Sequence, residues 1–128
     1  MHPETDITLG IRQDRFDAMK FESFVGRKGS GVGKRLGHHW VFSWQFQTTW
    51  EKVCKGISAA DWTKKQTAKS LFNDPEIWSA MKHGIRHAIG RCLRYFVDNG
   101  MLPLYVINPK STGTKYYAPL GLKVQTLS

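Results

Sequence analysis

The clearest pattern of apolar and polar positions lies between residues 85 and 99. Apolar residues recur there with helical period and form one stripe, made of Ile85, Ala88, Ile89, Cys92, Leu93 and Phe96. The opposite side of the same helix carries His87, Gly90, Arg91 and Arg94. The Asn99-Gly100 pair that follows contains the residue types that end helices in the left-handed region. The pattern therefore predicts an amphipathic helix over 85–99 whose exposed face is basic.

Two short runs of strand-forming residues follow this helix. Residues 104–107 (LYVI) and 114–118 (TKYYA) are rich in β-branched and aromatic side chains, which strands favour. Residues 108–113 (NPKSTG) between them are polar or turn-forming. This order predicts a β-hairpin with a polar, basic loop.

Helices are also predicted before this point in the chain. Residues 73–76 (NDPE) combine an N-cap residue, a proline suited to the first helical position and an acidic side chain in the first turn. They predict a helix over 75–83. Gly84 interrupts what would otherwise be one continuous helix over 75–99, and glycine costs about 1 kcal/mol in a helix interior relative to alanine. We therefore place a break there, and a further helix over 58–72.

The aromatic residues of segment 40–50 fit two patterns. They alternate with polar residues as in a strand, but they also fit a helical stripe that continues to Val53. The capping-box pattern of residues 48–51 (TTWE) favours a helix that begins near Thr49 and ends at Gly56. We expect these aromatic side chains to build the core; any that are exposed would form a homodimer or protein-partner interface.

Residues 1–37 are only weakly patterned, although 7–11 alternates as a short strand would. Segment 26–35 is rich in glycine and basic residues, and we interpret it as a mobile arm or linker. Basic arms of this kind commonly become ordered on a nucleic-acid backbone. The basic residues of this arm are Arg27, Lys28, Lys34 and Arg35. The predicted organisation is therefore an arm over 1–37 and one domain over 38–128.

The chain is strongly basic. It has 19 Lys and Arg residues against 10 Asp and Glu, a formal net charge of +9. Three bases and five acids give residues 1–23 a charge of −2, so sixteen bases and five acids give the remainder +11. A compact basic domain favours a polyanionic partner, and nucleic acid is the commonest one. The alternative is a surface charge that serves only solubility.

Three helices followed by a β-hairpin, with the basic amphipathic helix placed last, resemble the winged-helix family of DNA-binding domains. The most specific part is RCLRYFVDNGML (residues 91–102), where the basic helix ends at Gly100 and apolar residues enter the first strand. The resemblance implies an α+β, mainly helical domain: a winged helix-turn-helix of three helices and a C-terminal β-hairpin wing. It also implies binding of double-stranded DNA by a transcriptional regulator, or by an accessory factor in replication or recombination.

The same resemblance implies roles for individual residues. The family places its last helix in the major groove, and the side chains that would approach base edges are Arg86, His87 and Arg91. Arginine can bind guanine through two hydrogen bonds, which specifies sequence, and Gly90 would allow close approach of the backbone. The residues that would contact phosphates, and so position the protein, are Arg94, Lys110, Ser111, Thr112 and Lys115. Three further lysines form a second basic strip, which either extends this contact surface or is ordinary surface charge. They are Lys64, Lys65 and Lys69.

Catalytic, cofactor and metal sites find little support. The glycine-rich segment fails the phosphate-binding Walker A pattern, because Gly33-Lys34 is followed by Arg35 rather than by a hydroxyl residue. His83 and His87 could face one metal ion from one helix, but no Cys-x-x-Cys or HExxH motif accompanies them. Paired carboxylates and nucleophile motifs are absent from the sequence. We therefore expect no enzymatic activity, no cofactor and no bound metal.

The sequence has no apolar run long enough to span a bilayer, and its polar start is unlike a signal peptide. Cys54 and Cys92 lie among apolar residues at helical spacing, which predicts reduced core cysteines rather than a disulfide. We expect a cytoplasmic protein with no membrane partner. Two further functions stay open: an RNA-binding winged-helix protein, and a protein-interaction module such as an inhibitor of a nucleic-acid enzyme.

Overall fold

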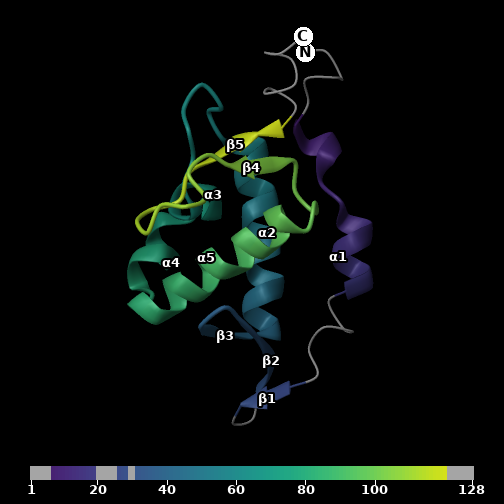
Figure 1. Ribbon diagram of the computed structural model, residues 1–128, viewed down its shortest axis with the longest axis vertical. Coiled ribbons are helices and arrows are strands. Elements are labelled where there is room, and N and C mark those ends of the chain that lie inside the picture. The colour runs from purple at the N-terminus through teal and green to yellow at the C-terminus, as the bar shows by residue number, and fades with distance from the viewer. Residues whose placement is uncertain (1–6, 20–25, 29–30, 121–128) are drawn as a thin grey trace.

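The computed structural model describes residues 7–19, 26–28 and 31–120 (Figure 1). Its fold is α+β and mainly helical, as the sequence predicts. The helices are α1 (Gln13–Met19), α2 (Ser43–Ala59), α3 (Ala68–Phe72), α4 (Pro75–Ala80) and α5 (His83–Asp98), preceded by the 3-10 turn η2 (Ile7–Gly10). The strands are β1 (Gly26–Lys28), β2 (Gly31–Leu36), β3 (His39–Phe42), β4 (Leu104–Val106) and β5 (Tyr117–Pro119). Within these residues, no helix is long and apolar enough to cross a membrane.

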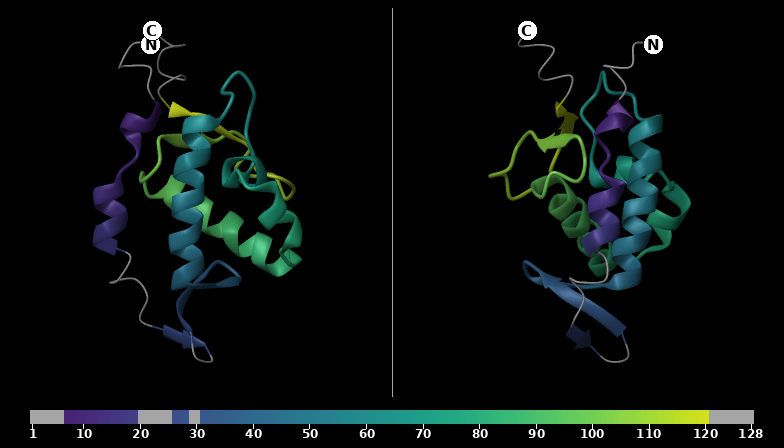
Figure 2. Two further views of the ribbon diagram at one scale, coloured as in Figure 1. Left: turned by 180° about the vertical axis from the view of Figure 1, so that it is seen from behind. Right: turned by 90° about the vertical axis from the view of Figure 1, so that its right-hand side faces the viewer.

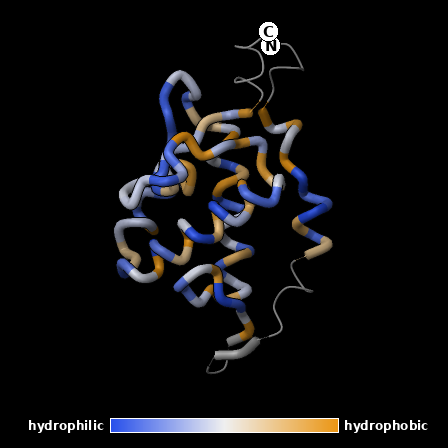
Figure 3. Tube along the Cα trace, viewed as in Figure 1, coloured by the Kyte–Doolittle hydropathy of each residue, from blue (hydrophilic) through white to orange (hydrophobic). Residues whose placement is uncertain are grey.

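The two longest helices form the centre of the molecule. α5 crosses in front of α2 in Figure 1, and the view from behind in Figure 2 shows α2 nearer the viewer. The antiparallel sheet β1–β2–β3 lies at one end of α2, and the β4–β5 hairpin lies at the other. Figure 3 shows hydrophilic and hydrophobic residues alternating along the helices, so each helix can bury one side and expose the other.

The core is centred on aromatic rings where α1, α2 and α5 meet. The Phe16 ring of α1 stacks on the Trp50 ring of α2, with ring centroids 4.6 Å apart. Beside this pair, the Phe46 ring of α2 and the Phe96 ring of α5 pack edge to face on each other, with ring centroids 4.7 Å apart. All four side chains are at most 1% exposed. Such ring pairs contribute about 0.5–1.5 kcal/mol each beyond simple burial, so this cluster fixes the three helices relative to one another.

The N-terminal residues that the structure describes belong to the same folded unit, which differs from the predicted arm over 1–37. Besides the Phe16 contact, Trp50 Nε1–H donates a 2.8 Å hydrogen bond to the Gln13 side chain. The Arg12 backbone N–H donates to the Met101 carbonyl at 2.9 Å. The sequence pattern gave little sign of this docking, because α1 buries a single side chain, Phe16.

The glycine-rich segment, interpreted as a mobile linker, contributes two strands instead. β2 pairs antiparallel with β1 and with β3, and Leu36 lies opposite His39 next to the turn. A Cβ atom at Gly33 would lie 2.8 Å from Trp40 Nε1, so glycine lets the indole pack against the strand. Gly37 has a φ of +63° and makes the turn between β2 and β3. These glycines serve close packing and a tight turn, which composition alone does not distinguish from mobility.

α2 begins at Ser43, earlier than the predicted start near Thr49. The Gln45 side chain accepts a 2.9 Å hydrogen bond from the Phe42 N–H, which gives the helix the start that residues 48–51 were expected to supply. Thr49 instead lies buried in the middle of the helix. The local capping pattern was therefore overruled by the longer apolar stripe that α2 buries.

The predicted helix over 58–72 is mostly a loop. The Asp61 carboxylate accepts hydrogen bonds from the Thr63 N–H at 3.1 Å and the Thr63 hydroxyl at 2.6 Å, so it stabilises a turn there. α3 starts only at Ala68. Within the loop, the Gln66 and Tyr117 backbones exchange hydrogen bonds of 3.1 and 2.8 Å. Gln66 therefore adds a third extended position beside the β4–β5 hairpin.

The break predicted near Gly84 is present, and it lies slightly earlier. α4 begins as predicted, with the Asp74 carboxylate accepting a backbone hydrogen bond from the first turn and Pro75 as the first residue. The chain turns at Met81 and Lys82, which are extended. Gly84 lies inside the first turn of α5 with open space around it. The hairpin also forms, with β4 paired to β5 and the loop 107–116 between them.

We predict that Phe16→Ala lowers the free energy of unfolding by about 3–5 kcal/mol, because it empties a fully buried ring site. Urea unfolding followed by tryptophan fluorescence measures the change. Leu9→Ala is the matched control, since the Leu9 side chain is 68% exposed and should change stability little. Equal stability of Phe16→Ala and the parent protein would show that α1 is not docked on the core.

Candidate nucleic-acid interface

α5 presents its outer side to an open groove. Its inner side packs on the core through Ala88, Ile89, Cys92, Leu93 and Phe96. The groove has a volume of about 800 Å³ and lies between this outer side, the loop 107–116, and parts of α3 and α4. Helical periodicity directs the apolar residues inward, so it also directs the intervening polar residues into the groove.

Most of the residues assigned to nucleic acid from the sequence line this groove. They are Lys69, Arg86, His87, Gly90, Arg91, Arg94, Ser111, Thr112 and Lys115. Five of them are Lys or Arg, and none of the described residues that line the groove is Asp or Glu. Lys64, Lys65 and Lys110 are not part of the lining. The fold thus concentrates positive charge from α3, α5 and the loop on one surface.

Arg86 has structural partners that the sequence did not indicate. Its Nε–H donates a 2.9 Å hydrogen bond to the Trp78 carbonyl, and one terminal nitrogen donates at 3.0 Å to the Ser79 carbonyl. These carbonyls belong to the last turn of α4, and the Trp78 carbonyl also accepts a 3.2 Å hydrogen bond from the Met81 N–H that ends the helix. The Arg86 guanidinium therefore joins α4 to α5, which leaves it poorly placed for the base-edge contact that the winged-helix resemblance implies.

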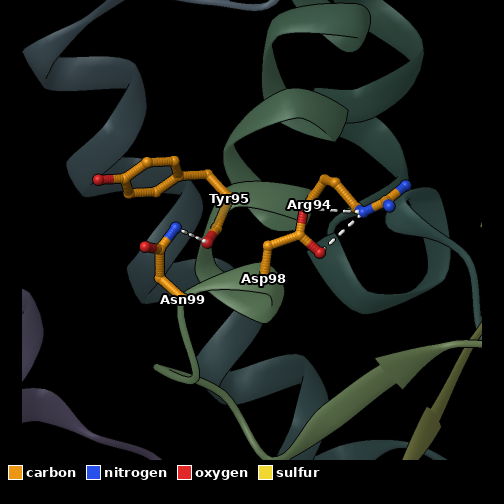
Figure 4. Close-up of polar contacts among 4 residues, drawn as sticks. All are labelled: Arg94, Tyr95, Asp98 and Asn99. Atoms are coloured by element: carbon orange, nitrogen blue, oxygen red, sulfur yellow. Dashed lines mark hydrogen bonds and ion pairs between the residues drawn. The ribbon is translucent and has the colours of Figure 1, made fainter.

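Arg94 is held by an acidic residue of its own helix. Figure 4 shows the Arg94 Nε–H donating to both carboxylate oxygens of Asp98, at 2.9 and 3.1 Å. Next to this pair, Asn99 Nδ2–H donates to the Tyr95 carbonyl at 2.8 Å and closes the end of α5. The Asp98 charge therefore offsets the Arg94 charge at this side of the groove. An exposed pair of this kind contributes little to stability, so a phosphate could replace the carboxylate at low cost.

Arg91 is different from these two arginines. Its side chain is exposed, and it has no hydrogen bond or ion pair among the residues that the structure describes. Its guanidinium lies beside the β2–β3 turn: Cζ is 3.2 Å from the position that a Cβ atom would take at Gly37. The neighbouring side chains are histidines. The His87 ring centroid lies 4.2 Å from that of His83 and 5.3 Å from that of His39.

Partial burial lowers the pKa of His39, and the positive charges of Arg91, His87 and His38 lower the pKa further. Burial and repulsion from these neighbours therefore both favour the neutral form of the His39 imidazole. A nearby anion would reverse this effect, since it favours the charged imidazolium.

The loop 107–116 has an ordered conformation that holds its polar residues at the groove. Asn108 bridges it, because its side chain donates to the Thr114 carbonyl and accepts from the Tyr116 N–H, both at 2.8 Å. The Lys115 ammonium donates to the Ser111 carbonyl. Lys65 Nζ lies 4.3 Å from the centroid of the Tyr116 ring, so this lysine also supports the base of the loop.

The other predicted contact residues are distributed around the sheet β1–β2–β3. Lys34 Nζ lies 4.9 Å from the centroid of the Tyr95 ring, and Arg35 is exposed on β2. The side chains of Arg27 and Lys28 lie outside what the structure describes. Most of the aromatic residues of 40–50 are buried or half-buried, as expected, but the Trp44 side chain is 60% exposed.

The described residues give no support for a metal site. They contain no group of three or more His, Cys, Asp or Glu arranged to hold a metal ion. Cys54 and Cys92 are unpaired thiols. Burial raises the pKa of each to about 12, so both are neutral thiols near pH 7.

Sequence reasoning missed three contributors to this surface. The sequence predicts Asn108 only as a turn residue, although an Asn-Pro pair in a hairpin loop can also indicate a side chain that bridges the two sides of that loop. His39 and Gly37 reach α5 only through tertiary packing of β3 on the helix, which no local pattern encodes.

The chain matches no protein-family model, no curated protein and no solved structure. Its function is therefore argued from the site alone.

We predict that Arg86→Ala lowers the free energy of unfolding by about 1–3 kcal/mol, because it removes two hydrogen bonds that join α5 to the end of α4. Arg86→Lys keeps the charge but lacks the forked donor, so it should also be destabilising. Thermal and urea unfolding measure both. Full stability of Arg86→Lys together with a loss in Arg86→Ala would mean that charge, rather than the two hydrogen bonds, is what matters at this position.

Proposed function

We propose that this protein binds double-stranded DNA as a winged-helix protein, with α5 in the major groove and the loop 107–116 as the wing. The observation that carries the proposal is the groove beside α5, whose lining contains five Lys or Arg and, among the described residues, no Asp or Glu. Such a surface attracts a polyanion and repels basic partners.

The order of the elements supports this proposal. The long helix α2 is followed by the extended position at Gln66, then by α3 and α4, then by α5 and the hairpin. Pairing of Gln66 with Tyr117 places a third extended segment beside β5, as expected for a strand between the first two helices of a winged helix. In this arrangement α5 would contact the base edges and determine sequence specificity, and the loop 107–116 would contact the DNA backbone.

The dimensions of α5 suit a major groove. The helix spans 16 residues, or about 24 Å, and a major groove about 12 Å wide admits a helix. The space beside Gly90 is open, so the helix backbone can approach the base pairs closely. His87 and Arg91 are the side chains that we assign to DNA contact from the helix, and Lys69, Lys110, Ser111, Thr112 and Lys115 those that we assign to phosphates.

The proposed protein acts by binding rather than by catalysis, as a transcriptional regulator or as an accessory factor in replication or recombination. We place it in the cytoplasm, where thiols stay reduced, because both cysteines are unpaired.

Fluorescence anisotropy with labelled duplex DNA, single-stranded DNA and hairpin RNA tests the proposal. We expect duplex to bind most tightly. If about five phosphates are neutralised, affinity should fall several-hundred-fold between about 50 and 200 mM salt. Preference for the RNA hairpin would instead support an RNA-binding protein. No binding to any of the three at low salt would contradict the proposal and favour a protein partner, for which the exposed Trp44 side chain is the first surface to test.

A charge-reversal pair localises the binding surface. Lys69→Glu places an acidic group in the lining of the groove and should weaken duplex binding by more than about tenfold at low salt. Lys55→Glu makes the same charge change on α2, which lies behind α5 in Figure 1, and should have a much smaller effect. Equal losses in the two variants would show that binding depends on net charge and not on the groove.

A further inference from the structure

Three cationic or ionisable side chains from two separate elements meet beside the β2–β3 turn. Arg91 and His87 come from α5, and His39 comes from the first position of β3. The turn is tight, with Gly37 at φ +63°, and the Arg91 guanidinium lies against it. The cluster therefore depends on packing of this hairpin on α5.

The ionisable groups that face this cluster can carry only positive charge. From α5 they are His83, His87 and Arg91, and from the hairpin turn they are His38 and His39. Arg86 is bound to the carbonyls of α4, and Lys115 lies across the groove. Among the described residues, no carboxylate pairs with Arg91 or with these histidines. The repulsion between Arg91 and the imidazoles would be relieved by an anion and increased by a metal cation.

The place of the cluster suits a backbone phosphate better than a base edge. In the right-hand view of Figure 2, the β2–β3 turn and the loop 107–116 project toward the same side of the molecule, with α5 between them. The loop would meet the DNA backbone on one side of the helix. The Arg91 guanidinium lies beside the β2–β3 turn, so it is placed to meet the backbone on the side of that turn.

We propose that Arg91, His39 and His87 form a phosphate-binding site that holds one phosphate group of the nucleic-acid backbone. This proposal rests on the proposed function and changes one residue role within it. Arg91 positions the duplex instead of reading a base. The β2–β3 hairpin acts as a second backbone contact, on the side of α5 opposite to the loop 107–116.

A consequence of the site is coupling between binding and protonation. A bound phosphate favours the imidazolium form of His39, so the pKa of His39 is higher in the complex than in the free protein. Binding is therefore strongest at low pH and weakens as the pH rises through the imidazole range, about pH 5 to 8. For one fully coupled proton, affinity falls up to about tenfold per pH unit.

The role of Arg91 is tested by measuring Arg91→Ala against a panel of unrelated duplex sequences over a range of salt concentrations. We expect a uniform loss of affinity, and a slope of log affinity against log salt that is smaller by about one unit. Lys55→Ala is the matched control for the lost charge. A loss confined to particular sequences would assign Arg91 to base reading, and no loss at all would remove it from the interface; either result overturns the site.

The role of the histidines is tested by the pH dependence of duplex binding in His39→Gln and His87→Gln, with folding checked by circular dichroism. We expect the parent protein to show the decline with rising pH and each variant to flatten it. An unchanged pH dependence in both variants overturns the site. His83→Gln is the comparison on the same helix, and it should flatten the dependence less, because the proposed phosphate site contains His39 and His87 but not His83, whose ring packs beside that of His87.

Titration with inorganic phosphate separates this inference from the proposed function. NMR signals of the His39 and His87 rings should shift with millimolar phosphate, and bound duplex should abolish that shift. Phosphate binding that duplex does not displace would assign the site to free phosphate and overturn its role in the nucleic-acid contact. Duplex binding without any effect of phosphate on these rings would leave the proposed function standing and overturn the site.

Discussion

The packing of α5 across α2 is the interaction on which the rest of this structure depends. The rings of Phe46 and Trp50 on α2 meet Phe96 on α5, and Phe16 covers them from α1. Because α5 buries its apolar stripe there, its polar side is forced outward along its whole length. The β2–β3 turn and the loop 107–116 are then placed beside that polar side by their own contacts with the helices. The crossing of α5 over α2 therefore brings basic residues from distant parts of the chain together on one surface.

The elements with strong local signals could be predicted from the sequence. The amphipathic period of 85–99, the capped start of α4 and the hairpin after Gly100 all have local causes, and the structure contains all three within a few residues of the predicted bounds. The same period identified the basic face of α5, and hence most residues that line the groove. Local sequence patterns predict an element correctly where the residues of that helix or turn are sufficient to determine it.

The sequence could not predict features that arise from contacts between distant segments. α1 has a single buried side chain, so no periodicity marks it, yet Phe16 is central to the core. The glycines of 31–37 look like a linker by composition, but Gly33 makes room for the Trp40 indole. The partner of Arg86 is the end of another helix, and His39 meets His87 only because β3 packs on α5. These pairings decide which cations are free to bind a ligand.

We propose that the outer side of α5, flanked by two hairpins, is where double-stranded DNA binds. Chemical-shift mapping of the ¹⁵N-labelled protein with a short duplex tests it most directly. We predict changes concentrated in α5, in the loop 107–116 and in the β2–β3 turn, with α2 largely unchanged. Changes centred on α2 and Trp44, or no changes at low salt, would contradict it.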